Sequence, residues 1–203
     1  GSEMCIRDRE REKLTCRLES EYGDKSFNML GAFSVEDMYR DIARESRAVY
    51  TARAYFDNTG DKKVLTLPVN QDDRVYQLLA TGMDQLRQTG EVFVSENLKK
   101  LSVRRAPRVT VGITLSGDLL DLTLSSEKLP FGELEGLLQS YRQRKKYYRL
   151  KDRDFLRLED NSVSALAEIM EGLSLDGRDL EAGSCRIPLS LIHISEPTRQ
   201  AEI

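Results

Sequence analysis

The amino-acid sequence predicts an α+β fold, in which mixed strands and hairpins pack with about four helices. Three observations support this class. Short segments of alternating apolar and polar residues, typical of strands, recur along the chain. Longer segments with apolar residues at helical spacing lie between them, without the strict alternation of βαβ units. Apolar residues make up 39% of the chain, which is enough to form a core.

The first half of the chain predicts a strand pair followed by two helices. Residues 13–22 alternate as a strand does, and they are expected to pair with residues 26–30 across a turn at Gly23. A helix is expected from a cap at Ser34 to about residue 56. A second helix is expected over residues 72–88. Its predicted buried stripe is Val75, Leu78, Leu79, Met83 and Leu86.

The second half predicts a hairpin and two more helices. Residues 108–115 form the clearest strand pattern, and residues 119–124 return after the turn Ser116-Gly117-Asp118. A third helix is expected from Pro130 to about Tyr148, and a fourth over residues 161–173. Further short strands are expected at residues 64–67, 91–94 and 155–158.

The chain is expected to divide into two small lobes. Residues 99–107 form a basic stretch that contains proline, and this stretch is the candidate boundary. The first lobe is then residues 10–102 and the second is residues 103–188.

The two ends are expected to lie outside the fold. Codons that encode Met4 to Asp8 have a reverse complement that, in another frame, encodes residues 190–193. The two ends are therefore consistent with the two strands of one DNA string, which resembles a transposase-type sequencing adapter. On this interpretation residues 1–9 and 189–203 are artefacts, and they are left out of the fold prediction.

Composition restricts the class of protein. Basic and acidic residues are intermixed and the net charge is −3, so only local clusters argue for an anionic partner. No apolar run approaches the roughly 20 residues of a membrane helix, and no signal peptide is visible. Three scattered cysteines, Cys5, Cys16 and Cys185, are typical of a reducing compartment, so a cytoplasmic location is expected.

The motifs of common enzymes are missing from the sequence. There is no G-x-x-x-x-G-K-[ST] phosphate loop and no G-x-G-x-x-G turn. The single histidine, His193, lies in an excluded end, which leaves no histidine for a catalytic triad or a metal site. Adjacent acids such as Asp72-Asp73 and Glu159-Asp160 are interpreted as solvated caps. We therefore expect no catalytic residue, no metal site and no ATP hydrolysis.

One tract carries an unusual density of cations and tyrosines. Residues 141–151 hold six basic residues and three tyrosines. Basic side chains neutralise phosphates and tyrosines stack on exposed bases, so the tract is a candidate nucleic-acid contact. The candidate residues are Arg142, Arg144, Lys145, Lys146, Tyr148, Arg149 and Lys151.

A structural role for this tract is an open alternative. On a continuous helix, Tyr141, Lys145 and Tyr148 would share one face. Cations gather at helix C-termini because they complement the helix dipole, and tyrosines there seal a helix against a sheet. A smaller basic cluster has the same two interpretations. It comprises Lys99, Lys100, Arg104, Arg105 and Arg108.

Several strings resemble the helicase-associated region of bacterial Swi/Snf proteins. They are residues 108–122, 137–142, 145–152 and 155–159. The first of these contains Ser-Gly-Asp-Leu-Leu, and the third contains Lys-Lys-Tyr-Tyr-Arg-Leu-Lys. The Glu21-Tyr22-Gly23 segment and the Arg40 to Glu45 helix are similar to that region too.

The resemblance implies an accessory part of an ATP-dependent DNA translocase, located N-terminal to its two motor lobes. The motor lobes of the same parent chain are the implied partner, with DNA as a second candidate and no membrane. ATP and magnesium are implied for the motor, and no cofactor is implied for this segment. The alternative is a protein-interaction or structural α+β domain unrelated to DNA. DNA binding by the segment distinguishes the two hypotheses.

Overall fold

The computed structural model describes residues 1–9, 12–31, 40–58, 60–61, 63–126, 129–158 and 161–192. It divides the chain into two compact units, Gly1–Val103 and Arg104–Ile203. The division lies one residue from the boundary expected at residues 102 and 103. Each unit combines strands and helices, which confirms the α+β class.

The first unit is built on a six-stranded sheet with the order β4-β5-β2-β1-β6, and β3 pairs with β2. Strand β1 lies between β2 and β6, and it is antiparallel to β2 and parallel to β6. The expected strand pair around Gly23 is present as β2 and β3. The strands are β1 (Ser2–Arg9), β2 (Lys13–Tyr22), β3 (Lys25–Asn28), β4 (Asp57–Asn58), β5 (Leu65–Pro68) and β6 (Glu91–Val94).

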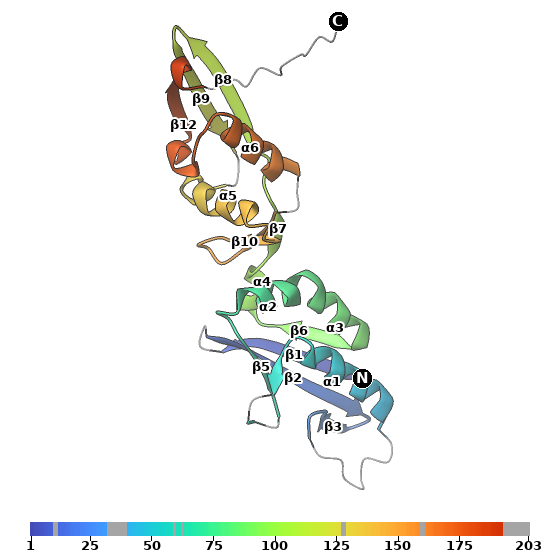
Figure 1. Cartoon of the computed structure of the whole chain (residues 1–203). Helices are drawn as coiled ribbons and strands as arrows, with labels where there is room; N and C mark the ends of the chain where they lie inside the picture. Colours follow the sequence, from blue (N-terminus) through green and yellow to red (C-terminus); the bar gives the residue numbers. More distant parts are fainter. Residues whose placement is uncertain are drawn as a thin grey trace, which may run out of the picture. The chain divides into compact units, whose positions relative to one another are not determined.

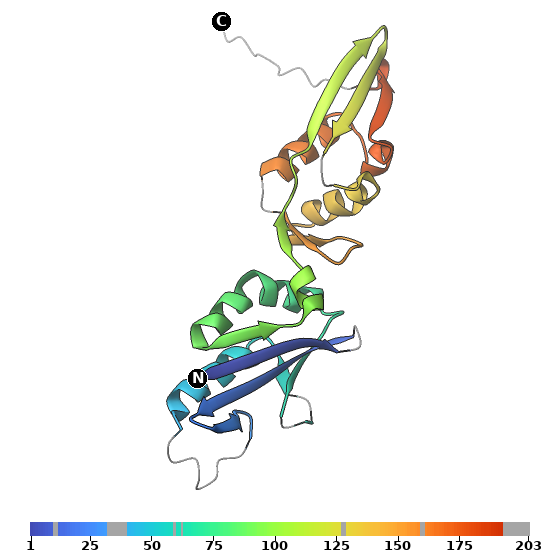
Figure 2. The same ribbon diagram turned by 180° about the vertical axis from the view of Figure 1, so that it is seen from behind.

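Helices cover one face of this sheet, as Figures 1 and 2 show for α1 and α3. The side chains buried beneath them come from alternate positions of β1 and β2, namely Met4, Ile6, Leu14, Cys16 and Leu18. The helical segments are α1 (Ile42–Arg53), α2 (Asp72–Gln77), the π-helical turn η2 (Leu78–Gly82), α3 (Met83–Thr89) and α4 (Glu96–Lys100).

The second expected helix is confirmed, whereas the start of the first differs. Segments α2, η2 and α3 run consecutively from Asp72 to Thr89. Val75, Leu78, Met83 and Leu86 are buried as expected, whereas Leu79 is only half-buried. Helix α1 begins at Ile42, where the Asp41 carboxylate accepts a hydrogen bond of 3.0 Å from the Arg44 N–H. The expected cap at Ser34 lies outside the described residues.

A buried ion pair fixes the N-terminal end of α1 against the sheet. The Arg40 and Glu45 side chains are almost fully buried, and Arg40 Nε donates to Glu45 Oε1 at 3.1 Å. The Tyr22 hydroxyl donates to the same oxygen at 2.9 Å. Burial by itself would raise the pKa of Glu45, but the hydrogen bonds from Arg40 and Tyr22 outweigh it and lower that pKa.

The expectation that residues 1–9 lie outside the fold is not what the structure shows. They form β1, which pairs on both of its sides, and the side chains of Met4 and Ile6 are fully buried. Complementary codons are a property of DNA and do not decide whether the encoded peptide packs. The alternation of Met4 and Ile6 with Cys5 and Arg7 fits a strand with one buried face. Gly90 supports this packing, because a Cβ there would lie 2.4 Å from the Ser2 carbonyl oxygen.

The second unit contains two three-stranded sheets, with the orders β10-β11-β7 and β12-β9-β8. Its core includes Leu122, Leu134, Leu138, Leu166 and Met170. The strands are β7 (Val103–Arg105), β8 (Thr110–Ser116), β9 (Leu119–Ser125), β10 (Tyr147–Arg149), β11 (Phe155–Arg157) and β12 (Ser184–Pro188). The helical segments are η3 (Phe131–Glu133), α5 (Leu134–Arg142), α6 (Asn161–Gly172), η4 (Gly177–Leu180) and η5 (Leu189–Leu191).

The β8–β9 hairpin confirms the turn expected at Ser116-Gly117-Asp118. Ser116 pairs with Leu119, and Gly117 has a φ of +62°, as the first central residue of a type II′ turn requires. Strand β12, which pairs with β9, was not predicted. Residues 189–191 form η5, and His193 with the rest of the C-terminal segment lies outside the described residues.

The position of β1 can be tested by two neighbouring substitutions. Ile6→Ala should lower the free energy of unfolding by about 2–5 kcal/mol, because it leaves a cavity in the core. Arg7→Ala, on the exposed face of the same strand, should change it by about 0.5 kcal/mol or less. Chemical denaturation of both variants measures the difference. Equal stability of Ile6→Ala and the unmodified chain would show that β1 does not pack in the sheet.

Candidate nucleic-acid interface

The basic tract is not a continuous helix. Helix α5 ends at Arg142, and residues 147–149 form strand β10. The expectation of a helix reaching Tyr148 is therefore wrong, and so is the expected shared face of Tyr141, Lys145 and Tyr148. The cations follow one another through a turn and a strand instead.

A left-handed residue terminates α5. Arg144 has a φ of +56°, a conformation that glycine adopts more easily than other residues. The Lys145 N–H donates to the Ser140 carbonyl at 3.1 Å, and the Arg144 N–H donates to that of Tyr141 at 2.8 Å. These two bonds form a Schellman motif, which closes the end of a helix and turns the chain away from its axis.

Packing of Tyr148 explains why the chain leaves the helix. The Tyr148 ring lies against Gly136 of α5, where a Cβ would be only 2.6 Å from the tyrosine hydroxyl. The hydroxyl hydrogen-bonds to the buried carboxylate of Glu133, and the Lys151 N–H donates to the same carboxylate at 3.0 Å. Burial, and then the charge of Glu133, raise the pKa of Tyr148. These contacts require an extended segment beside α5.

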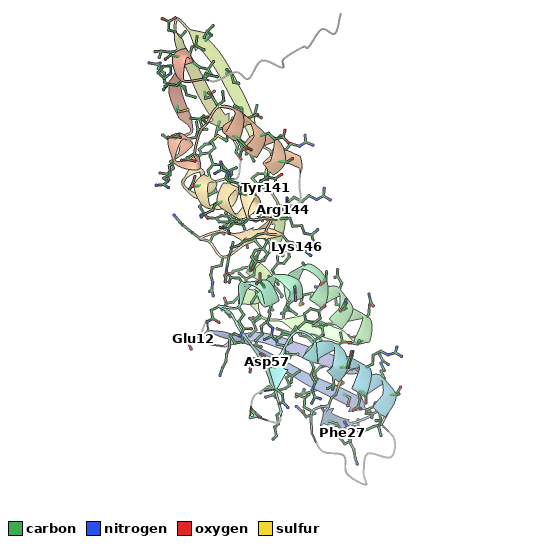
Figure 3. All side chains as sticks on the ribbon, viewed as in Figure 1. Glu12, Phe27, Asp57, Tyr141, Arg144 and Lys146 are labelled. Atoms are coloured by element: carbon green, nitrogen blue, oxygen red, sulfur yellow. The ribbon has the colours of Figure 1, made fainter. Side chains whose placement is uncertain are left out.

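Four cations of the tract are exposed at the last residue of α5 and in the turn that follows it. We call this segment, Arg142–Lys146, the basic turn. Arg142, Arg144, Lys145 and Lys146 are all exposed. Figure 3 shows Arg144 and Lys146 where α5 ends beside β10. Arg142 Nη1 lies 4.0 Å from Asp176 Oδ1, at the limit of an ion pair between two largely exposed side chains. Such a pair contributes little to stability, so these cations are accessible to an anionic partner.

The other candidate residues have a larger structural role. Arg149 is half-buried, with its guanidinium 5.3 Å from the centre of the Phe155 ring. Tyr147 contacts the same ring edge to face, with ring centres 5.3 Å apart. Tyr148 is half-buried against Gly136 and Glu133. Both tyrosines of β10 therefore pack within the fold, as the structural alternative expects. Lys151 is exposed and lies beyond β10.

Sequence reasoning missed one cation beside the basic turn. Arg157 of β11 is exposed and pairs in register with Tyr147, directly after Lys146. The Leu158 N–H also donates to the Lys146 carbonyl at 3.0 Å. Arg157 could have been identified as a neighbour of Lys146 if residues 147–157 had been predicted as a hairpin. The helix that was expected to reach Tyr148 excluded such a hairpin.

The smaller basic cluster is distributed over both units. In the first unit, Lys99 Nζ lies 2.6 Å from Glu96 Oε1, as an exposed helical pair. In the second, Arg104 is hydrogen-bonded to Asp154 and, at 3.2 Å, to Asp152. Arg105 and Arg108 are exposed. Arg104 thus holds the β10–β11 turn to β7, while the roles of the other members stay predictions.

Within the described parts of the chain, no group of three or more His, Cys, Asp or Glu side chains is arranged to hold a metal ion. Over the same residues, no helix combines the length and apolarity needed to cross a membrane. Cys16 is fully buried, and burial raises the pKa of its thiol to about 12, which keeps this thiol protonated and unreactive.

The chain is thus a mixed α+β protein with an exposed basic turn. The family model described as bacterial SNF2 helicase associated matches residues 6–193. The chain therefore belongs to this family, whose domain is an accessory part of helicase-type proteins and is not itself catalytic. No curated protein and no solved structure matches the chain.

The end of α5 can be tested at Arg144. Arg144→Gly should raise the free energy of unfolding by about 0.5–1 kcal/mol, because glycine removes the strain of a positive φ. If α5 continued through this position, the same change would lower stability by about 1 kcal/mol relative to Arg144→Ala. Chemical denaturation of Arg144→Gly and Arg144→Ala shows which of the two variants has the larger free energy of unfolding. A glycine variant less stable than the alanine variant would contradict the Schellman end.

Proposed function

We propose that this chain is a non-catalytic accessory segment of a bacterial Swi/Snf-type ATP-dependent DNA translocase, and that it contacts the DNA backbone. The contact is assigned to the basic turn, with Arg157 beside it. Lys151 lies beyond the other end of β10 and is not part of this assignment. The observation that carries the proposal is the accessibility of four cations within the five residues of the basic turn, whose backbone is hydrogen-bonded.

Electrostatics favour phosphate as the ligand of the basic turn. Phosphate contacts require exposed cations that neighbouring acids have not already neutralised. Among the residues that the structure describes, Arg142 is the cation of this turn that lies near an acid, Asp176. The tyrosines of the tract are half-buried: the Tyr147 ring contacts Phe155, the Tyr148 ring lies against Gly136, and Tyr141 packs against the core. Stacking on bases is therefore not part of the proposal, and sequence-independent backbone contact is expected.

The proposal includes a division of labour in the parent protein, which membership of the family supports. The motor lobes, in the same parent chain, bind ATP and magnesium and perform translocation. This segment needs no cofactor for backbone contact. Its role is to hold duplex DNA near the motor through contacts that tolerate any sequence.

A triple substitution tests this proposal. Arg144→Gln/Lys145→Gln/Lys146→Gln should weaken binding of a short fluorescent duplex about ten-fold or more at low salt. It should also reduce the slope of log affinity against log salt by about 2–3, because each phosphate contact contributes about 0.9. Glutamine removes the charge and retains much of the stem packing.

The matched control removes three exposed cations from helices of the first unit, in Arg44→Gln/Arg47→Gln/Arg87→Gln. It changes the net charge equally and should leave affinity within about two-fold. Absence of salt-dependent binding by the unmodified chain would refute the DNA contact and favour the protein-interaction alternative. Equal losses in the two triple variants would refute its assignment to the basic turn.

A further inference from the structure

Strand β8 is an edge strand whose outer side is unpaired within the described part of the chain. It pairs with β9, and the sheet ends there in the order β12-β9-β8. Figures 1 and 2 both show β8 at the outside of this sheet. An unpaired edge presents a row of backbone N–H and C=O groups, and it can accept a further strand.

The hydrogen bonds of β9 identify the groups on this edge. The Leu124 N–H donates to the Gly183 carbonyl at 2.7 Å, so the backbone N–H and C=O groups of Leu124 point away from β8. Val111 is the register partner of Leu124, so its backbone N–H and C=O groups likewise point away from β9. The side to which these groups point alternates from one residue of a strand to the next. The backbone groups of Val111, Ile113 and Leu115 therefore point to the free edge.

The side chains of β8 lack the features that usually protect an edge. No residue from Thr110 to Ser116 is charged, and none is proline. Ile113 is 55% exposed and Leu115 is 62% exposed, although both share a face with the buried Leu122. The apolar face of the sheet thus continues past the part that the core covers, up to its edge.

We propose that β8 pairs with β8 of a second copy of this chain. The pair is antiparallel and has its twofold axis at Ile113. This register uses all three outward-facing residues, because Ile113 faces its own copy and Val111 faces Leu115. It joins the two sheets into one, and it brings the exposed apolar side chains of both copies together.

Charge complementarity supports a second copy in this register. Residues equidistant from Ile113 face each other in the antiparallel pair. Arg108 and Asp118 are each five positions from Ile113, and both are exposed. The Arg108 side of one copy therefore meets the Asp118 side of the other at both ends of the paired strands. Opposite charges at the rim fix register and suppress other alignments.

Sedimentation velocity of the full chain over a range of concentrations tests the pairing. A single edge is a small interface, so weak, reversible association is expected, from 23.2 kDa towards twice that mass. Ile113→Lys places two like charges on the axis and should raise the dissociation constant about ten-fold or more. Thr123→Lys, on the central strand β9, adds the same charge and should associate like the unmodified chain.

A charge exchange tests the register and does not depend on Ile113→Lys folding. Arg108→Asp should weaken association several-fold, and Arg108→Asp/Asp118→Arg should restore it. Circular dichroism confirms that each variant is folded. A single species of 23.2 kDa at up to about 1 mM would overturn the proposal. Association that Ile113→Lys does not weaken, or that the double exchange does not restore, would overturn it as well. None of these results depends on DNA binding.

Discussion

The buried carboxylate of Glu133 constrains the second unit more than any other polar group described in it. A carboxylate removed from water must be matched by hydrogen-bond donors. The Tyr148 hydroxyl and the Lys151 N–H supply them, and both come from the chain that follows α5. Because Glu133 directly precedes α5, these bonds bring residues 148–151 back to the start of the helix. The segment in between, the basic turn, must therefore form the reversal.

This constraint separates the cations of the tract by role. Arg149 lies on the returning strand, where its guanidinium packs on Phe155 and contributes to the fold. Arg144 to Lys146 lie on the reversal, where the backbone is held by the Schellman bonds and the side chains remain exposed. A contact surface built this way presents positive charge on an ordered backbone, so less conformational entropy is lost when a phosphate binds. The accessory role shown by the family is compatible with such a surface.

Local patterns predicted the parts of the fold that depend on local physics. The apolar stripe of Val75, Leu78, Met83 and Leu86 identified the second helix, and Gly117 identified the hairpin turn. The end of α5 could not be predicted in this way, because residues 141–148 have good helix propensity and only tertiary contacts of Tyr148 override it. Arg157 was missed for the same reason, since it becomes a neighbour of Lys146 only through the β10–β11 register. Strand β12 depends likewise on distant pairing with β9.

The N-terminal strand was missed for a different reason. Residues 1–9 carry a clear strand alternation, but their possible origin in an adapter string removed them from consideration. Packing depends on side-chain chemistry, and Met4 and Ile6 meet its requirement for an apolar face. The origin of a segment and its place in a sheet are separate questions, which need separate observations.

The most direct measurement of DNA contact by the basic turn is a nuclear magnetic resonance titration of the isotope-labelled chain with a short duplex. If the basic turn contacts DNA, amide shifts should concentrate at residues 142–146, with smaller changes at Arg157, and they should diminish as salt is added. Shifts confined to other surfaces, or no shifts at low salt, would contradict the account.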